Sequence, residues 1–267
     1  MGAMRAGIKR LVGRTIFKSR LDAFLLHNSA VVVTFHRVGE TQVTEGLTVG
    51  VDLFEAYCRF FKRYFNVVSL GNLVGKLESG ATLNRELAIT FDDGYRDNFE
   101  HAAPVLEKLA LPATFFVVTQ WMGTDVVPWW DRQIGVRYPW MTWDQVRSLH
   151  QRGFDVGAHT RTHVDLGSVT DDEALREILG ARWELEDQLS AKVEFFAYPY
   201  GRMANLIDAN RSLVRAAGFR CCCSCFGGVN VPGSDPFELK RVPISPSSPS
   251  PLQFGFELAL GRSIQPA

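Results

Sequence analysis

Two short segments of this sequence carry residue types that bind metal ions and move protons. In the first, residues 90–94 (TFDDG), two carboxylates stand side by side. Adjacent carboxylates repel each other and burial would raise the pKa of either, so a nearby cation is needed to stabilise such a pair. In the second, residues 159–163 (HTRTH), two imidazoles lie four residues apart. On one helical turn this spacing puts both rings on the same face, where they can bind one ion.

Each segment alone has a simpler interpretation, as a polar turn or as a chance pair of histidines. Together they supply one aspartate and two histidines, the ligand set of a catalytic metal site with open positions. This set suits Zn²⁺ and also Co²⁺ or Ni²⁺. The second carboxylate is then free to act as a base.

A third segment, residues 196–201 (FAYPYG), ends another apolar run. Proline followed by Tyr-Gly can fix a loop so that a backbone N–H faces a cavity and stabilises an oxyanion. The simpler interpretation is a turn that ends a strand.

These segments need a scaffold, and short apolar runs alternate with helical patterns along the chain. The predicted strands are 30–35, 66–70, 86–91, 113–118, 154–156, 193–197, 219–226 and 239–242. The predicted helices are 54–65, 73–77, 97–109, 143–151, 170–190, 203–217 and 251–260. Continuous apolar strands are typical of parallel sheets buried on both faces, and seven or eight of them favour an α/β barrel over an open sheet. Catalytic residues of such barrels lie at the carboxyl ends of strands, where all three segments fall.

The three segments resemble the motifs of the polysaccharide deacetylases, carbohydrate esterase family four. The first motif, Thr-Phe-Asp-Asp-Gly, and the second, His-Ser/Thr-x-x-His, match in full, whereas the third, Arg-x-Pro-Tyr, matches at Pro199 and Tyr200 only. The resemblance runs from about Val31 to Ile244. It implies a distorted (β/α)7-type barrel, which we expect as a single domain over residues 30–267. The charge and apolar spacing of residues 1–29 separately predict a helical extension before it.

The resemblance also implies roles for residues. Asp92 would be the general base, and the backbone N–H of Tyr200 would belong to the oxyanion hole. The metal ligands would be Asp93, His159 and His163. The implied enzyme uses a metal-activated water to remove acetyl groups, N-acetyl above all, from a glycan or a lipid-linked sugar, and so hydrolyses linear amides.

Two family residues are missing from their usual places. The family's general acid is a histidine near the C-terminus, but no histidine follows His163. His36 follows the first predicted strand and is either an active-site residue or a hydrogen-bonded structural histidine. Ala197 stands where the third motif has the arginine that pairs with the base. Arg241 ends the last predicted strand, and we expect its guanidinium within ~6 Å of the Asp92 carboxylate.

Candidate substrate contacts are Pro199, Tyr200, Trp129 and Trp130. The two tryptophans stand in the loop after the fourth predicted strand. Aromatic side chains there suit stacking on sugar rings, and they suit packing of the loop onto the barrel equally well.

The composition is that of an ordinary globular protein: 267 residues, 46% hydrophobic and 22% charged. This excludes disordered and coiled-coil chains. Lys+Arg and Asp+Glu are equal at 29 each, so no global field favours nucleic acid as a partner. No apolar run reaches the roughly 20 residues of a spanning helix.

Residues 1–29 nevertheless carry six basic side chains and one acid, with apolar residues at helical spacing between them. We expect a basic amphipathic helix that either packs on the domain or makes peripheral contact with an anionic membrane. The basic residues interrupt any secretory core, so we expect no signal peptide and a cytoplasmic protein, with the inner face of the membrane as its peripheral location. Four of the five cysteines crowd residues 221–225, where a buried strand in a reducing compartment is favoured over a soft-metal site.

Two other functions compete with the deacetylase. A non-catalytic glycan-binding relative would explain the missing acid. A metal-independent hydrolase of cyclic amides shares the fold but usually lacks the two histidines, which are present here.

Overall fold

The structure, a computed structural model, describes residues 2–40 and 46–260, with side chains from residue 6 onward. Its core is an eight-stranded parallel sheet, in which seven strands follow the order β10-β1-β5-β6-β7-β8-β9 and β4 pairs with β5. The strands are β1 (Ala30–Phe35), β4 (Asn66–Val67), β5 (Glu86–Phe91), β6 (Thr114–Val117), β7 (Asp155–Ala158), β8 (Phe195–Ala197), β9 (Cys221–Cys223) and β10 (Val242–Pro243). A separate pair joins β2 (Arg37–Val38) to β3 (Thr48–Val49).

The segment before β10 joins the two ends of this curled sheet. Leu239 forms a parallel bridge with Cys223 of β9, and three residues later Val242 pairs with Val33 of β1. The short stretch between them therefore spans the gap between the edge strands, and it carries Arg241 into the barrel interior.

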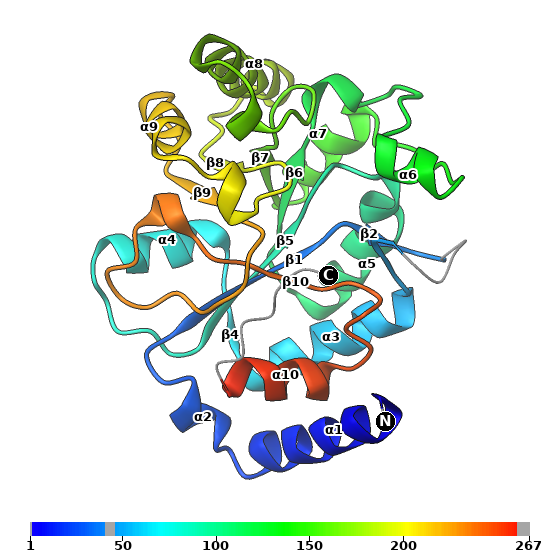
Figure 1. Ribbon diagram of the computed structural model, residues 1–267, viewed down its shortest axis with the longest axis vertical. Coiled ribbons are helices and arrows are strands. Elements are labelled where there is room, and N and C mark those ends of the chain that lie inside the picture. Colours follow the sequence, from blue (N-terminus) through cyan, green and yellow to red (C-terminus); the bar gives the residue numbers. More distant parts are fainter. Residues whose placement is uncertain (1, 41–45, 261–267) are drawn as a thin grey trace.

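Helices surround the sheet (Figure 1). They are α1 (Gly2–Lys18), α2 (Asp22–Leu25), α3 (Val51–Tyr64), α4 (Leu70–Glu78), α5 (Ala103–Leu109), α6 (Trp129–Gln133), α7 (Trp143–Gln151), α8 (Asp171–Leu189), α9 (Asp208–Ala216) and α10 (Pro251–Ala259). None of the helices in the described part of the chain is both long enough and apolar enough to cross a membrane.

Most predicted elements are found, although two of the later strands are shorter than predicted. Residues 221–223 form a strand instead of 219–226, and residues 242–243 instead of 239–242, so Arg241 precedes the last strand rather than ending it. Three other local differences concern an earlier strand and two helices. Residues 66–70 form only a two-residue strand, because Ser69 caps α4 by accepting a hydrogen bond from the Asn72 N–H. The predicted helix 97–109 begins with a π-helical turn, η1 (Asn98–Ala102), and the predicted helix 203–217 is divided into a 3₁₀ turn and α9.

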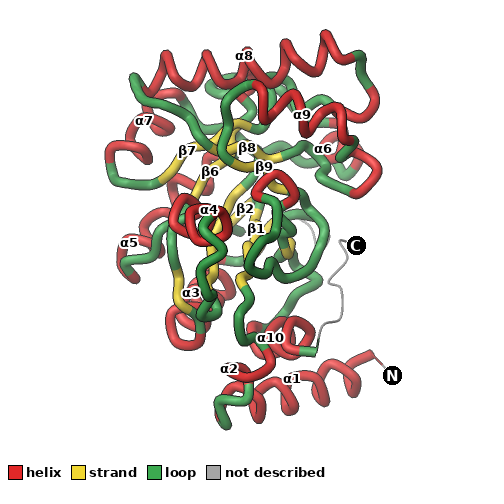
Figure 2. Tube along the Cα trace, turned by 90° about the vertical axis from the view of Figure 1, so that its left-hand side faces the viewer, coloured by secondary structure: helices red, strands yellow, loops and turns green. Residues whose placement is uncertain are grey.

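The N-terminal helices pack on the barrel rather than standing apart from it. Ile16 and Phe17 of α1 are buried, and the Phe17 ring lies 4.8 Å from that of Phe60 in α3. Figures 1 and 2 both show α1 alongside α10, at the end of the molecule opposite α8. The buried Asp22 of α2 pairs with Arg85, 2.6 Å away. Residue 1 of the predicted helical extension and residues 261–267 of the predicted barrel domain lie outside the described residues.

Candidate active site

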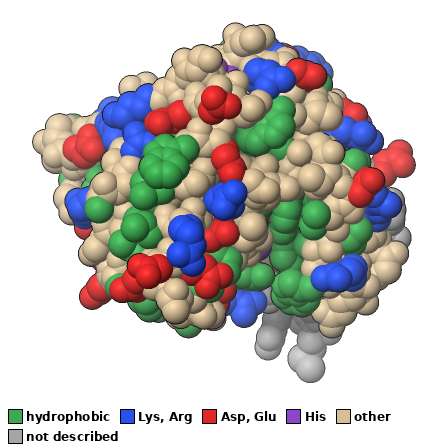
Figure 3. Space-filling view, turned by 90° about the horizontal axis from the view of Figure 1, so that it is seen from above, with side chains coloured by type: hydrophobic (Ala, Val, Ile, Leu, Met, Phe, Trp, Pro, Cys, Tyr) green, Lys and Arg blue, Asp and Glu red, His purple; other side chains and the backbone are tan. Residues whose placement is uncertain are grey.

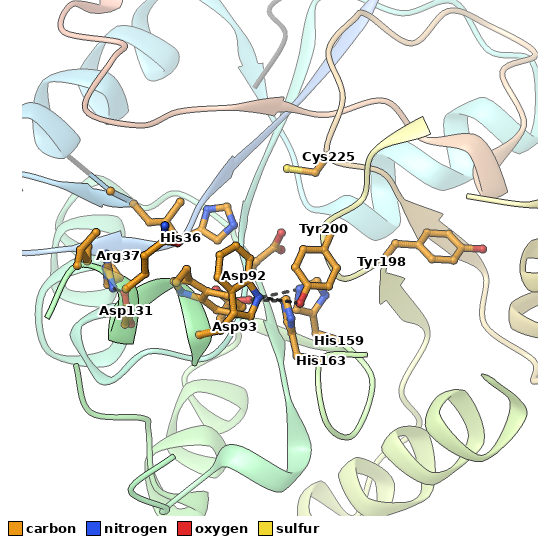
Figure 4. Close-up of a pocket in the computed structure, with 16 residues that line it drawn as sticks. His36, Arg37, Asp92, Asp93, Asp131, His159, His163, Tyr198, Tyr200 and Cys225 are labelled. Carbon is orange, nitrogen blue, oxygen red and sulfur yellow. Dashed lines mark hydrogen bonds and ion pairs between the residues drawn. The ribbon is translucent and has the colours of Figure 1, made fainter. Parts of the chain in front are cut away.

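A pocket of about 370 Å³ opens at the carboxyl ends of β1, β5, β7 and β8. Figure 4 shows the side chains that gather around it. Asp92, Asp93, His159, His163 and Tyr200 all line this pocket. The structure thus brings together three segments that are far apart in the sequence.

Asp93 and the two histidines converge on one point. The Asp93 Oδ1 atom lies 3.4 Å from the His159 Nε2 atom and 3.3 Å from the His163 Nε2 atom. All three side chains are buried, and one ligand atom from each lies within 4.8 Å of the others. This is the compact set of three donors that a divalent metal requires.

The two histidines do not lie on a helical turn, so that part of the sequence interpretation is wrong. Residues 159–163 form an irregular loop, with positive φ at Thr160 (60°) and at His163 (61°). The Glu177 carboxylate of α8 anchors the loop by accepting hydrogen bonds from the Arg161 and Thr162 N–H groups. The rings meet because the loop folds back on itself, not because of a 3.6-residue period.

Neighbouring groups orient both rings. The His159 Nδ1 atom lies 2.8 Å from the Ala197 carbonyl oxygen, so this nitrogen carries the proton. The lone pair of Nε2 is then free to bind a metal ion. The His163 ring stacks on Trp121 at a centroid distance of 5.2 Å. Burial lowers the pKa of His163, although the nearby Asp93 opposes this effect. The lowered pKa keeps the ring neutral, and therefore able to bind a metal, at pH 7.

The donor set fits a metal ion by a second criterion. Asp93 Oδ1 is buried and accepts no hydrogen bond of good geometry from any described residue. A buried carboxylate without a full set of partners is costly unless a cation balances it. Burial tends to raise the pKa of Asp93, but the two histidines outweigh it and hold the pKa well below its usual value. The carboxylate is therefore ionised, as a ligand must be.

Asp92 is paired with Arg241 instead. The Arg241 guanidinium donates two hydrogen bonds of 2.7 Å, one to each oxygen of the Asp92 carboxylate, well within the ~6 Å set from the sequence. The Arg241 Nη1 atom, one of the two nitrogens that bind Asp92, also lies at a longer hydrogen-bond distance from the Thr34 and Thr90 hydroxyl oxygens. Burial tends to raise the pKa of Asp92, but the Arg241 charge contributes to a net lowering.

The loop after β8 makes a tight turn at Tyr200. The Gly201 N–H donates to the Pro199 carbonyl at 2.6 Å, and Tyr200 has φ of 60°. The Tyr200 N–H donates no hydrogen bond to any described residue, so it is available to a ligand. A Cβ on Gly201 would come within 2.5 Å of the Cys225 nitrogen, which explains glycine here. Pro199 itself is buried and does not line the pocket, so it shapes this loop without facing a substrate.

His36 and Cys225 complete the inner wall of the pocket. The His36 ring is half-buried and hydrogen-bonds to none of the described residues, which disfavours a purely structural role. Cys225 was not singled out from the sequence, because it is one of four clustered cysteines. Burial raises the pKa of its thiol to about 11, so the thiol remains protonated at neutral pH.

The outer wall is α6, which carries Trp129 and Trp130. Trp129 is 55% exposed, and its Nε1 atom donates to the Tyr200 hydroxyl at 3.3 Å. Trp130 is half-buried, and its ring centroid lies 5.0 Å from that of His163. Both therefore border the pocket, as either role suggested from the sequence would allow.

A fully buried ion pair at the edge of this pocket was missed in the sequence. The Arg37 guanidinium of β2 donates to Asp131 of α6 at 2.6 Å. The Tyr95 hydroxyl donates to the second Asp131 oxygen at 3.0 Å, and the Arg37 guanidinium lies 3.9 Å from the Tyr138 ring centroid. These contacts fasten α6, the wall-forming helix, to β2 and to the loop that follows β5.

Comparison with known proteins finds relatives that are named as polysaccharide deacetylases or N-deacetylases. The sequence model of one family, described as polysaccharide deacetylase, matches residues 79–222, more than half of the chain. A Bacillus subtilis (strain 168) protein, provisionally named a polysaccharide deacetylase, is 27% identical over 161 residues. These residues are 59% of this chain and 51% of that protein, so the match spans about half of the relative's length. A poly-beta-1,6-N-acetyl-D-glucosamine N-deacetylase of Staphylococcus aureus (strain MRSA252) is 21% identical over 82% of this chain and 79% of its own.

Solved structures show the same fold. IcaB from Ammonifex degensii superposes with a TM-score of 0.73 at 23% identity, covering 86% of this chain and 97% of that one. The Streptococcus pyogenes deacetylase PplD in complex with acetate gives 0.71 at 22% identity, covering 85% and 96%. The predicted (β/α)7-type barrel is confirmed.

Proposed function

Because this chain belongs to the polysaccharide deacetylase family, we propose that it is a metal-dependent hydrolase that removes N-acetyl groups from a glycan or a lipid-linked sugar. The observation that carries the proposal is the division of labour between adjacent carboxylates. Asp93 faces two histidines, while Asp92 is held by Arg241 in the same pocket. The site therefore offers a metal-binding set and a separate oriented base.

Asp93, His159 and His163 would hold the ion. A divalent metal bound there supplies Lewis-acid chemistry and lowers the pKa of water towards ~7. Asp92 then takes the proton of the attacking water at a carboxylate oxygen. Although Arg241 occupies one lone pair of each oxygen, a second lone pair remains on each for this proton.

Two further groups serve the later stages of the reaction. The Tyr200 N–H donates to the carbonyl oxygen of the acetyl group as that oxygen becomes negative. When the C–N bond breaks, the departing amine needs a proton. His36 is the candidate donor, because its ring lines the pocket and hydrogen-bonds to no residue in the described part of the chain. The products are acetate and a free amino sugar.

The pocket wall and the relatives support the proposed substrate class. Trp129, Trp130 and Tyr200 present aromatic surface suited to sugar rings. The Staphylococcus aureus relative is named for poly-beta-1,6-N-acetyl-D-glucosamine, which makes β-1,6-linked N-acetylglucosamine oligomers the first substrate to test.

The test is an acetate-release assay on acetylated oligosaccharides and lipid-linked sugars, run with the zinc, cobalt and nickel forms and after chelation. We expect acetate and free amine in equal amounts, loss of turnover on chelation, and recovery on adding metal. Bound metal with no acetate from any substrate would favour the glycan-binding alternative. Turnover that survives complete chelation would favour the metal-independent hydrolase.

A further inference from the structure

Helix α1 has two apolar faces, and only one of them is used by the fold. Gly13, Ile16 and Phe17 are buried against α3 and α10. On the opposite face Ile8 and Leu11 are 55% and 66% exposed. Residues at i, i+3 and i+4 share one side of a helix, so these and the exposed Val12 form one apolar stripe.

Helix α2 and the residue before it expose further apolar side chains next in sequence to α1. Leu21, Phe24 and Leu25 are exposed, and Phe24 is the most exposed of all, at 78%. Six of the fifteen large apolar side chains that are exposed in the described part of the chain lie within residues 8–25. An apolar concentration of this kind marks an interaction surface rather than random exposure.

A basic stripe runs beside the apolar one. Arg10, Arg14 and Lys18 follow one another at four-residue spacing, are all exposed, and form no ion pair with any described residue. The opposite end of the molecule differs, because acidic and basic side chains are mixed over the face seen from the α8 side (Figure 3). The surface of α1 and α2 therefore combines exposed apolar groups with unpaired positive charge.

We propose that the α1–α2 surface docks this protein on an anionic lipid surface. An interfacial helix inserts apolar side chains at the level of the headgroups while its basic side chains reach lipid phosphates. A second copy of the chain fits less well, because a symmetric contact through this surface would bring two basic stripes together. The inner face of α1 remains packed on the barrel, so docking requires no unfolding.

The docked orientation leaves the pocket accessible. Strand β1 begins at Ala30, close after α2, and ends at Phe35, next to His36 in the pocket wall. Figure 1 shows α1 and α2 at the end of the molecule away from the strand ends that carry the site. The pocket therefore faces away from the lipid and meets a glycan that stands clear of the surface.

The test is co-sedimentation of the full chain with vesicles of phosphatidylcholine alone or mixed with phosphatidylglycerol. We expect binding only to the mixed vesicles, and weaker binding as salt screens the charges. Replacing Arg10, Arg14 and Lys18 together by glutamine is expected to weaken partitioning roughly 100-fold. The variant Leu11→Ser/Phe24→Ser is expected to weaken it about tenfold or more.

The matched control is Arg176→Gln/Trp183→Ser on α8, where both side chains are exposed at the opposite end of the molecule; it should bind vesicles like the unmodified chain. Circular dichroism checks that every variant is folded. Equal sedimentation of the unmodified chain and the α1–α2 variants would overturn the proposal. So would a dimer in sedimentation velocity that the Leu11→Ser/Phe24→Ser variant abolishes while vesicle binding is absent, since the occupant would then be a second copy.

Discussion

Asp92 and Asp93 are neighbours in the chain, yet their carboxylates have different partners. Asp93 has φ of 75°, a left-handed conformation in which the chain turns sharply at the end of β5. One carboxylate consequently faces Arg241 and the other faces two imidazoles. A motif of two identical residues can thus supply two functions, and substitutions should separate them.

The first prediction contrasts the proposed base with a proposed metal ligand. Asp92→Asn should retain bound metal but lose roughly 10²–10⁴-fold in turnover, because an amide cannot take the proton. His159→Ala should instead lose most of its metal together with its activity. Metal content after dialysis, measured beside acetate release, distinguishes the two. Full metal content in His159→Ala would contradict the ligand assignment, and loss of metal in Asp92→Asn would exchange the roles of the aspartates.

The second prediction concerns Arg241 as a positioning residue. Arg241→Ala removes the cation that lowers the pKa of Asp92, so the pKa of this carboxyl should rise. The base works only when ionised, and the acidic limb of the pH–rate profile should therefore move to higher pH. Misplacement of the base should also lower kcat by up to ~10²-fold, with bound metal retained.

Arg241→Lys is the companion variant, because it keeps the charge but lacks the two-pronged donor. It should restore the position of the acidic limb more fully than it restores kcat. If both variants leave the acidic limb and kcat unchanged, Arg241 has only a structural role.

At the scale of single residues, the sequence indicated the site where it contains combinations of residue types that are rare. The TFDDG and HTRTH segments stand out because few positions of an ordinary fold need paired carboxylates or paired imidazoles. Arg241 could be inferred because Ala197 left a buried carboxylate without a cation. Cys225 could not, because only the packing of its loop against Gly201 turns it into the pocket.

Among the elements, α6 depends on the Arg37–Asp131 pair, and the third prediction tests this. Asp131→Asn leaves the buried Arg37 charge uncompensated and should lower the free energy of unfolding by about 3–5 kcal/mol. Because Trp129 and Trp130 are carried by the same helix, KM for oligosaccharides should rise more than kcat falls. Urea unfolding and steady-state kinetics measure both effects.

Two variants control this experiment. Arg137→Gln breaks the ion pair with Asp125 in the same loop, but both of those side chains are exposed, so the cost should be at most about 1 kcal/mol. Arg37→Met/Asp131→Leu removes both buried charges and should recover much of the lost stability. A rise in KM that persists in this stable double variant would show that the pair orients α6; an unchanged KM in Asp131→Asn would contradict that role.

Elements were predictable where their residues repeat one physical pattern. Strands β1 and β5 are predominantly apolar runs, and the structure gives them the bounds expected from the sequence. The two-residue strands β2 and β3 carry no such pattern, because their pairing depends on tertiary contacts such as the one between Arg37 and Asp131, 94 residues later. The histidine loop was misread for the same reason: its shape depends on Glu177 of α8, 14 residues beyond His163.

For the whole molecule, the contacts of α1 with α3 and α10 predict that the N-terminal helices and the barrel unfold as one cooperative unit. The buried Phe17 touches α3, and Lys9 pairs with Glu257 of α10 at 2.6 Å. The helices α1 and α10 approach closely at Gly13, where a Cβ would clash with the Leu252 carbonyl oxygen. A glycine is needed there because the two backbones approach each other directly.

The last prediction follows from that contact. Gly13→Ala should lower the free energy of unfolding by about 1–3 kcal/mol, because the added methyl group forces α1 away from α10. Gly7 lies on the same helix with nothing within 4 Å of its Cβ position, so Gly7→Ala should instead stabilise the protein by roughly 0.5–1 kcal/mol. Opposite signs in urea unfolding, with a single transition in each variant, would show that α1 folds together with the barrel. If Gly13→Ala stabilised the protein as Gly7→Ala does, α1 would not be docked on α10 in solution, and the extension would be a separate unit.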